Sequence, residues 1–234
     1  MDTGLSGLTS FKWQKFNQES IKPGQIWELS QSVHTPLEFS SVEWQSLYSD
    51  SALSFLDGNS PPRYVMIVRE PEPAVEQSEW QIVTVMLLSL KTDCLSNVNL
   101  LIPSYVSGVG RDLLAETWHV LPMLACNLSH LVGRLSRQVY DVLLTVGDYY
   151  HDLVDEAPPI QEIQSLGLRV RAVSAEQQPE IQAFHQQEEA WADVLTVPVA
   201  AYRTYLKAVK LTEAILDDAL QIEQEFLNFP QSQL

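Results

Sequence analysis

The sequence predicts an α+β protein with a small β-barrel closed by a helix and followed by a C-terminal helical hairpin. Two observations predict this class. Between residues 61 and 150, short apolar runs of strand length lead into an amphipathic helical stretch. Beyond residue 159, two longer stretches repeat their apolar residues at helical spacing. A chain of 234 residues with 45% hydrophobic residues can bury a core of this size.

The elements are predicted in the following order. The first strand covers residues 26–29, after the turn signal Pro23-Gly24. Residues 37–57 have the spacing of short helical or irregular pieces, which end where a glycine and two prolines follow. Apolar strands are expected at 64–68, 80–88, 99–102 and 117–121. A helix then opens near Gly133, with Ser136 as its N-cap and Gly147 where it can stop.

The C-terminal third changes character. Residues 166–173 alternate basic and apolar side chains, which is typical of a half-exposed edge strand. Helices are predicted at 179–195 and after a break at Val197-Pro198, and we expect them to form an antiparallel hairpin. The predicted domains are therefore an N-terminal docking arm (1–20), a barrel domain (21–156) and an acidic helical extension (157–234).

Charge and composition restrict the function. The chain holds 30 acidic and 14 basic residues, a net charge of −16, so it repels nucleic-acid phosphates unless its few bases gather on one face. We expect no DNA partner. The sequence shows neither a membrane-spanning apolar run nor a secretory signal, which predicts a cytoplasmic protein that does not bind a membrane. Cys94 and Cys126 are expected to be buried free thiols.

The segment Lys22-Pro-Gly-Gln-Ile-Trp-Glu-Leu29, the strand order and the helix start Gly133-Arg-Leu-Ser136 resemble the PemK/MazF-like family. These proteins are SH3-like barrels best known as the ribonuclease toxins of toxin–antitoxin pairs. The resemblance covers residues 21–147. It implies RNA cleavage without metal by an arginine at the start of the second strand and a hydroxyl at the end of the third. Here those positions are Arg63 and Ser89, with Thr92 just beyond.

The chain also departs from the family pattern. Tyr64 stands where the family's strand start has proline, and Val-Leu-Pro-Met-Leu-Ala at 120–125 replaces a polar segment. We therefore expect a regulatory module, built on a degenerate barrel, that binds another protein or a second copy of itself. The alternative is a metal-independent endoribonuclease using Arg63 with Ser89 or Thr92. A third possibility is a barrel whose acidic C-terminal helices cover its own RNA groove, as a built-in antitoxin.

The last predicted helix is the expected binding element, because its apolar stripe is longer than one small barrel needs to cover. The stripe includes Val209, Leu216, Leu220 and Leu227. No cofactor is expected. No metal site is expected either, because His185, Glu188 and Glu189 share a helical face without a further ligand nearby.

Overall fold

The computed structural model describes residues 21–71, 80–174 and 177–227, and for residues 41, 211 and 213–227 only the backbone. The N-terminal arm predicted for 1–20 and most of the loop predicted at 71–79 lie outside this range. One antiparallel sheet of six strands, in the order β4-β5-β3-β2-β1-β6, forms the centre of the molecule. The strands are β1 (Gln25–Leu29), β2 (Tyr64–Arg69), β3 (Ile82–Ser89), β4 (Asn99–Ile102), β5 (Leu113–Leu124) and β6 (Leu128–Arg134).

The predicted α+β class is confirmed, but the sheet is not closed. Within the described residues, β4 and β6 are its two edges and do not pair with each other, so the barrel is not confirmed. The helices are α1 (Ser41–Leu47), α2 (Asp50–Leu56), α3 (Ser104–Ser107), α4 (Arg137–Tyr150), α5 (Ile160–Ser165), α6 (Pro179–Trp191) and α7 (Asp193–Leu227), with a 3-10 turn at Ala125–Asn127.

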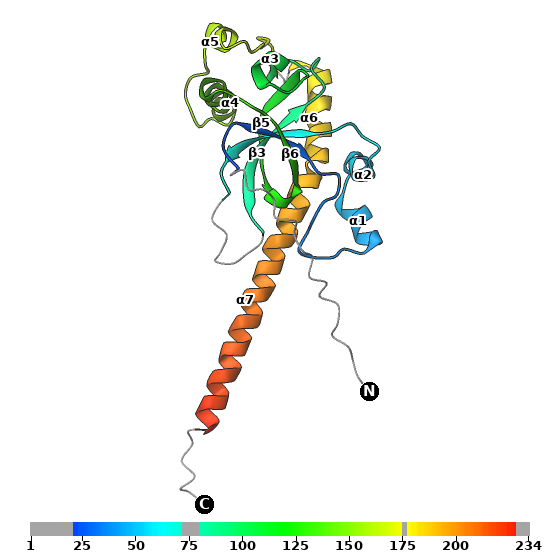
Figure 1. Cartoon of the computed structure of the whole chain (residues 1–234), viewed down its shortest axis with the longest axis vertical. Coiled ribbons are helices and arrows are strands. Elements are labelled where there is room, and N and C mark those ends of the chain that lie inside the picture. The colour runs from blue at the N-terminus through cyan, green and yellow to red at the C-terminus, as the bar shows by residue number, and fades with distance from the viewer. Residues whose placement is uncertain (1–20, 72–79, 175–176, 228–234) are drawn as a thin grey trace, which may run out of the picture.

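Helices cover both faces of the sheet and give the molecule three layers (Figure 1). Along each strand successive side chains point to opposite faces, so the continuous apolar runs supply two cores. The first core joins one face to α4; its members include Ile26, Met66, Met86, Leu100, Leu143 and Val146. The second joins the other face to α2, α6 and α7; its members include Trp27, Ile67, Val85, Phe55, Trp191 and Leu195.

The N-cap predicted for helix α4 is confirmed, but the helix does not open near Gly133 as predicted. Ser136 is its N-cap and accepts a hydrogen bond from the Val139 amide. The predicted stop at Gly147 is wrong, because the helix continues to Tyr150. Gly147 instead faces β5 at close range: a Cβ atom there would lie 2.4 Å from the carbonyl oxygen of Thr117. The glycine therefore serves the packing of α4 on the sheet.

Strand β6 was not predicted, because the apolar residues of 128–135 also fit the helical spacing that continues into α4. Gly133 lies inside this strand and not at a helix start. A Cβ atom at Gly133 would lie 2.5 Å from the carbonyl oxygen of Ser107, so only glycine allows this close approach. The edge strand predicted at 166–173 forms only one bridge, between Leu101 and Arg169, beside β4.

The predicted C-terminal hairpin is wrong. Only Ala192 separates α6 from α7, in a right-handed helical conformation that leaves no loop in which the chain could reverse. Pro198 does not break the chain either but lies inside α7. The first turns of α7 are buried against the sheet through Val194, Leu195 and Val199, and the rest of the helix projects away from it (Figure 1).

Among the residues that the structure describes, no helix is both long and apolar enough to cross a membrane.

Candidate functional site

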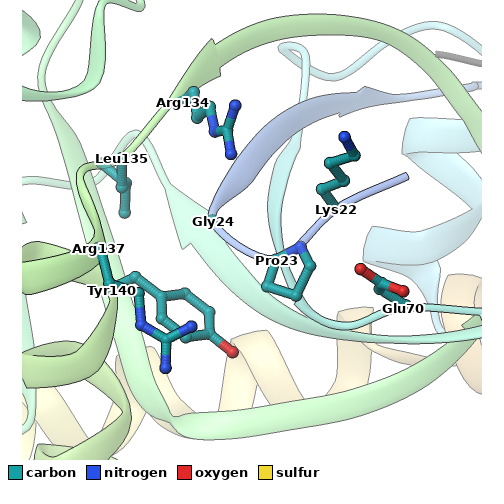
Figure 2. Close-up of a pocket in the computed structure, with 8 residues that line it drawn as sticks. All are labelled: Lys22, Pro23, Gly24, Glu70, Arg134, Leu135, Arg137 and Tyr140. Atoms are coloured by element: carbon teal, nitrogen blue, oxygen red, sulfur yellow. The ribbon is translucent and has the colours of Figure 1, made fainter. Parts of the chain in front are cut away.

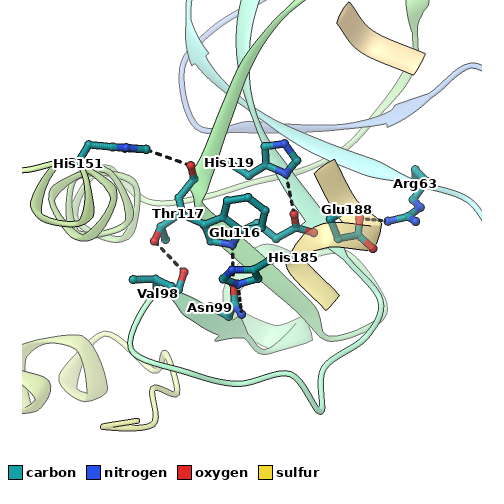
Figure 3. A network of polar contacts seen from close by, with 10 residues as sticks. Arg63, Val98, Asn99, Glu116, Thr117, His119, His151, His185 and Glu188 are labelled. Carbon is teal, nitrogen blue, oxygen red and sulfur yellow. Dashed lines mark hydrogen bonds and ion pairs between the residues drawn. The ribbon is translucent and has the colours of Figure 1, made fainter. Parts of the chain in front are cut away.

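Arg63, the residue that the family resemblance favours most, lies just before β2 and beside α6, with its guanidinium directed toward Glu188 (Figure 3). Its Nη1 donates a hydrogen bond to Oε2 of Glu188 at 2.5 Å. The guanidinium also lies over the ring of Trp191, 4.5 Å from its centroid. The side chain of Arg63 is 16% exposed and that of Glu188 is fully buried. This arginine is therefore engaged by the chain's own helix.

Glu188 belongs to a second buried contact, with Glu116 of β5. Both carboxyl groups are inaccessible to solvent. Burial, and then the negative charge of Glu188, raise the pKa of Glu116 well above its usual value, although the charge of Arg63 lowers it. Oε1 of Glu116 and Oε1 of Glu188 are buried and have no hydrogen-bond partner among the described residues. The raised pKa favours the protonated form of Glu116.

A bulge in β5 places Glu116 in this position. Met86 and Leu88 of β3 are two residues apart, but their partners on β5, Val120 and Ala115, are five apart. The extra residues of β5 are unpaired with β3, and a bulge of this kind aims side chains in new directions. The displaced stretch is Glu116-Thr117-Trp118-His119, and all four residues are buried.

His119 and His185 lie on either side of Trp118. The ring centroid of His119 is 4.3 Å from that of Trp118, and the ring centroid of His185 is 4.1 Å from it. Burial lowers the pKa of both histidines to about 4, and for His119 the charge of His185 adds to the effect. Asn99 connects the group, since it accepts from the Trp118 indole at 2.9 Å and its amide nitrogen lies 3.0 Å from Nε2 of His185.

These contacts favour one proton arrangement. Neutral His119 donates from Nδ1 to Oε2 of Glu116 at 3.1 Å, Glu116 is protonated, and Oε2 of Glu188 accepts from Arg63. The positive charge of Arg63 and the negative charge of Glu188 then cancel. We call Arg63, Glu116, His119 and Glu188 the charge cluster. It joins β2 and β5 to α6 without an unpaired buried charge.

The hydroxyls that the family resemblance pairs with Arg63 lie at the same end of the sheet. Tyr64 of β2 pairs with Leu88 of β3, so Arg63 and Ser89 are opposite one another in the register. Ser89 is only 2% exposed, and its hydroxyl accepts from the backbone amide of Lys91. Thr92 is half-buried in the turn that follows β3. The ammonium of Lys91 donates to the Gln187 side chain, so α6 engages a second cation here.

The binding residues predicted on the last helix lie on the projecting part of α7. Val209 is half-buried. Leu216, Leu220 and Leu227 are in helical backbone, but their side chains lie outside the described part of the structure.

The three helical residues considered as metal ligands are directed to other partners. His185 contacts Trp118 and Asn99, Glu188 contacts Arg63, and Glu189 is exposed. In the described part of the chain, no three histidine, cysteine, aspartate or glutamate side chains are placed to hold a metal ion. Cys94 and Cys126 are free and half-buried.

Sequence reasoning missed Glu116, His119 and Asn99. The available signal was an acid and a histidine inside an apolar strand, where such residues are seldom buried without partners. The partners come from β2 and α6, which are distant in the sequence, so spacing along the chain could not reveal them. Comparison with models of known protein families gives no match, and comparison with characterised proteins gives none either.

Proposed function

We propose that this protein is a regulatory module that binds another protein and that its sheet is a divergent PemK/MazF-like scaffold without nuclease activity. The antiparallel sheet with its Arg63–Ser89 edge and the capped helix α4 support the relationship. The projecting part of α7 is the binding element, because it extends beyond the sheet that its first turns cover.

The observation that carries the proposal is the ion pair between Arg63 and Glu188. An arginine that stabilises a cleaved phosphate must present its guanidinium to that phosphate. Here the guanidinium has Glu188 on one side and Trp191 beside it, and both belong to α6. A hollow of about 450 Å³ adjoins the start of β2 at Pro62, but its one charged lining residue is Glu28, which repels a phosphate.

One observation favours a second candidate, a metal-independent endoribonuclease inhibited by its own helix. The two α6 residues that meet the cations, Gln187 and Glu188, present oxygen atoms to Lys91 and Arg63. Phosphate oxygens would make the same contacts. In this reading α6 acts as a built-in antitoxin, as the third possibility from the sequence requires.

A ribonuclease assay distinguishes the two. We expect neither the wild-type chain nor the variant Glu188→Gln to cleave single-stranded RNA in the presence of a chelator. Glu189→Gln, an exposed change of the same type on the same helix, is the matched control. If Glu188→Gln cleaves RNA, and Arg63→Ala in that background abolishes cleavage, the inhibited endoribonuclease replaces the binding module.

A further inference from the structure

A basic cavity lies beside the N-terminus of α4, away from the charge cluster (Figure 2). Its volume is about 280 Å³. It is lined by Lys22, Pro23, Gly24, Glu70, Arg134, Leu135, Arg137 and Tyr140. The charged residues come from the turn before β1, from the ends of β2 and β6, and from the first turn of α4, so four separate segments meet around it.

A type II turn at residues 22–25 fixes one wall. Pro23 and Gly24 are its central residues, and the amide of Gln25 donates to the carbonyl of Lys22 at 3.2 Å. Gly24 has a φ of +80°, the conformation that the third position of such a turn requires. Its amide donates to Ile67 and its carbonyl accepts from Leu135, which ties the turn to β2 and to the start of α4. The wall is therefore rigid.

Tyr140, which also lines the cavity, is held in place as well. The hydroxyl of Tyr140 donates to the carbonyl of Val68 at 2.6 Å, which holds the ring in place. Burial raises the pKa of Tyr140, while the charge of Arg137 lowers it. Arg137 lies over the Tyr140 ring and pairs with Asp141 at 2.9 Å.

The local charge contrasts with that of the whole chain. Three of the 14 basic residues, Lys22, Arg134 and Arg137, line this cavity in a protein of net charge −16. The acidic residue of the lining is Glu70, and Asp141, which pairs with Arg137, is not part of the lining. Three positive charges and one negative charge give the lining a charge of +2. The first turn of α4 adds the positive end of the helix dipole on the same side.

We propose that this cavity binds a phosphate monoester the size of a mononucleotide. A dianionic phosphate matches the local charge of +2, and Arg134 and Arg137 can each contact two phosphate oxygens. The volume is slightly below the range of pockets for drug-sized ligands, which favours a small molecule. The site does not depend on the proposed function, because it shares no residue with the charge cluster or with the projecting part of α7.

The test is a thermal-denaturation titration of the full chain at constant ionic strength. The probes are inorganic phosphate, adenosine 5′-monophosphate and chloride. We expect a saturable rise in melting temperature with the first two and none with chloride. Arg134→Gln and Lys22→Gln should each weaken the fitted affinity roughly tenfold, because each removes a charge-assisted contact. Arg203→Gln, at an exposed arginine of α7, removes the same charge elsewhere and should leave the affinity unchanged.

A second pair of variants separates the site from the stability of α4. Arg137→Gln and Asp141→Asn both remove the Arg137–Asp141 pair. Only Arg137→Gln should weaken phosphate binding, whereas Asp141→Asn should preserve or strengthen it. Equal effects of phosphate and chloride, or equal affinities in all variants, would overturn the proposal. Single-stranded RNA without a terminal phosphate monoester is a further probe. If it binds at least tenfold more tightly than adenosine 5′-monophosphate, through the same arginines, an RNA contact would replace the proposed phosphate-monoester site.

Discussion

At the scale of single residues, the charge cluster combines two opposed effects. Taking ions out of water costs several kcal/mol for each ion, and the attraction between Arg63 and Glu188 offsets this cost only while both are present. Glu116 avoids adding a third charge by keeping its proton. A buried cluster of this kind need not add net stability, because desolvation offsets the attraction, but the loss of either partner leaves a buried charge unpaired.

The first prediction concerns the loss of one charge. Arg63→Ala leaves Glu188 buried without its cation, so we expect the free energy of unfolding in urea to fall by about 3–5 kcal/mol. The control is Arg111→Ala, because Arg111 is exposed and only approaches the Tyr64 ring, at 5.9 Å. That change should cost less than about 1 kcal/mol. A similar small loss for Arg63→Ala would mean that the pair is effectively solvated.

The second prediction concerns pH. The pKa of His119 is about 4 in the folded chain and 6.5 when unperturbed, so its contribution is complete above pH 6.5 and is lost as the pH falls toward 4. The loss amounts to at most about 3 kcal/mol. Urea unfolding between pH 4 and 7.5 should show it, and His119→Gln should flatten this part of the profile. An unchanged profile in the variant would contradict the lowered pKa.

Glu116 gives a third prediction of opposite sign. Its pKa is raised by folding, so its contribution is complete below the unperturbed value of 4.5 and is lost as the pH rises toward the folded pKa. Glu116→Gln cannot ionise. We therefore expect the variant to gain stability relative to the wild-type chain as the pH rises from 4.5 to 8, measured by urea unfolding at each pH. Curves that remain parallel would show that Glu116 does not hold the proton.

At the scale of elements, the contact between α4 and β5 depends on Gly147. A Cβ atom there would lie 2.4 Å from the Thr117 carbonyl oxygen, and backbone atoms on both sides leave no flexible end to move. We expect Gly147→Ala to lower the melting temperature, with a loss of roughly 1–3 kcal/mol, despite the higher helix propensity of alanine. Gly110→Ala, where a Cβ atom would meet nothing within 4 Å, is the control. If the two variants have the same melting temperature, α4 can shift to accommodate the added methyl group without a loss of stability.

Local signals predicted the elements that depend on local chemistry. The apolar runs at 64–68 and 99–102 become β2 and β4, the spacing of 37–57 gives the short helices α1 and α2, and Ser136 caps α4. The predictions fail where the spacing of the apolar residues fits both a strand and a helix, or where tertiary contacts determine the secondary structure. Residues 128–135 fit both a strand and a helix, and Pro198 is tolerated inside α7.

The candidate site shows the same division. The sequence identified Arg63, but it could not name its partner Glu188, which lies 125 residues away. The bulge that contains the buried residues Glu116 and His119 follows from the pairing of β5 with β3. No local sequence pattern specifies that pairing. The projection of α7 beyond the sheet could not be predicted either. An apolar stripe shows that a helix face packs against a partner, but not whether that partner belongs to the same chain.

At the scale of the whole molecule, residues on both sides of the boundary predicted at 156–157 share the same cores. Trp191, Val194 and Leu195 are buried with β2 and α2, and Leu168 is buried with α4. A chain ending at Glu156 would expose these apolar surfaces and leave Arg63 without Glu188. We expect it to lack a cooperative unfolding transition by calorimetry. A sharp transition in that fragment would establish 21–156 as an independent domain, as the sequence predicts.

The last prediction concerns the projecting part of α7. In the sequence, its apolar stripe (Val209, Leu216, Leu220 and Leu227) continues past the turns that pack on the sheet. A partner or a second copy would stabilise an apolar helix face of this length. We expect the full chain to self-associate in light scattering at high concentration, and Leu216→Glu with Leu220→Glu to abolish the association without changing the melting temperature of the sheet. Burial of each leucine would contribute roughly 1.5–3 kcal/mol. The control adds the same two charges at exposed positions of α7, Thr204→Glu with Ala208→Glu, and should leave association intact. A wild-type chain that stays monomeric would show that the leucines of this helix bind no second copy. A control that dissociates equally would show that added charge alone, and not the loss of the leucines, prevents association.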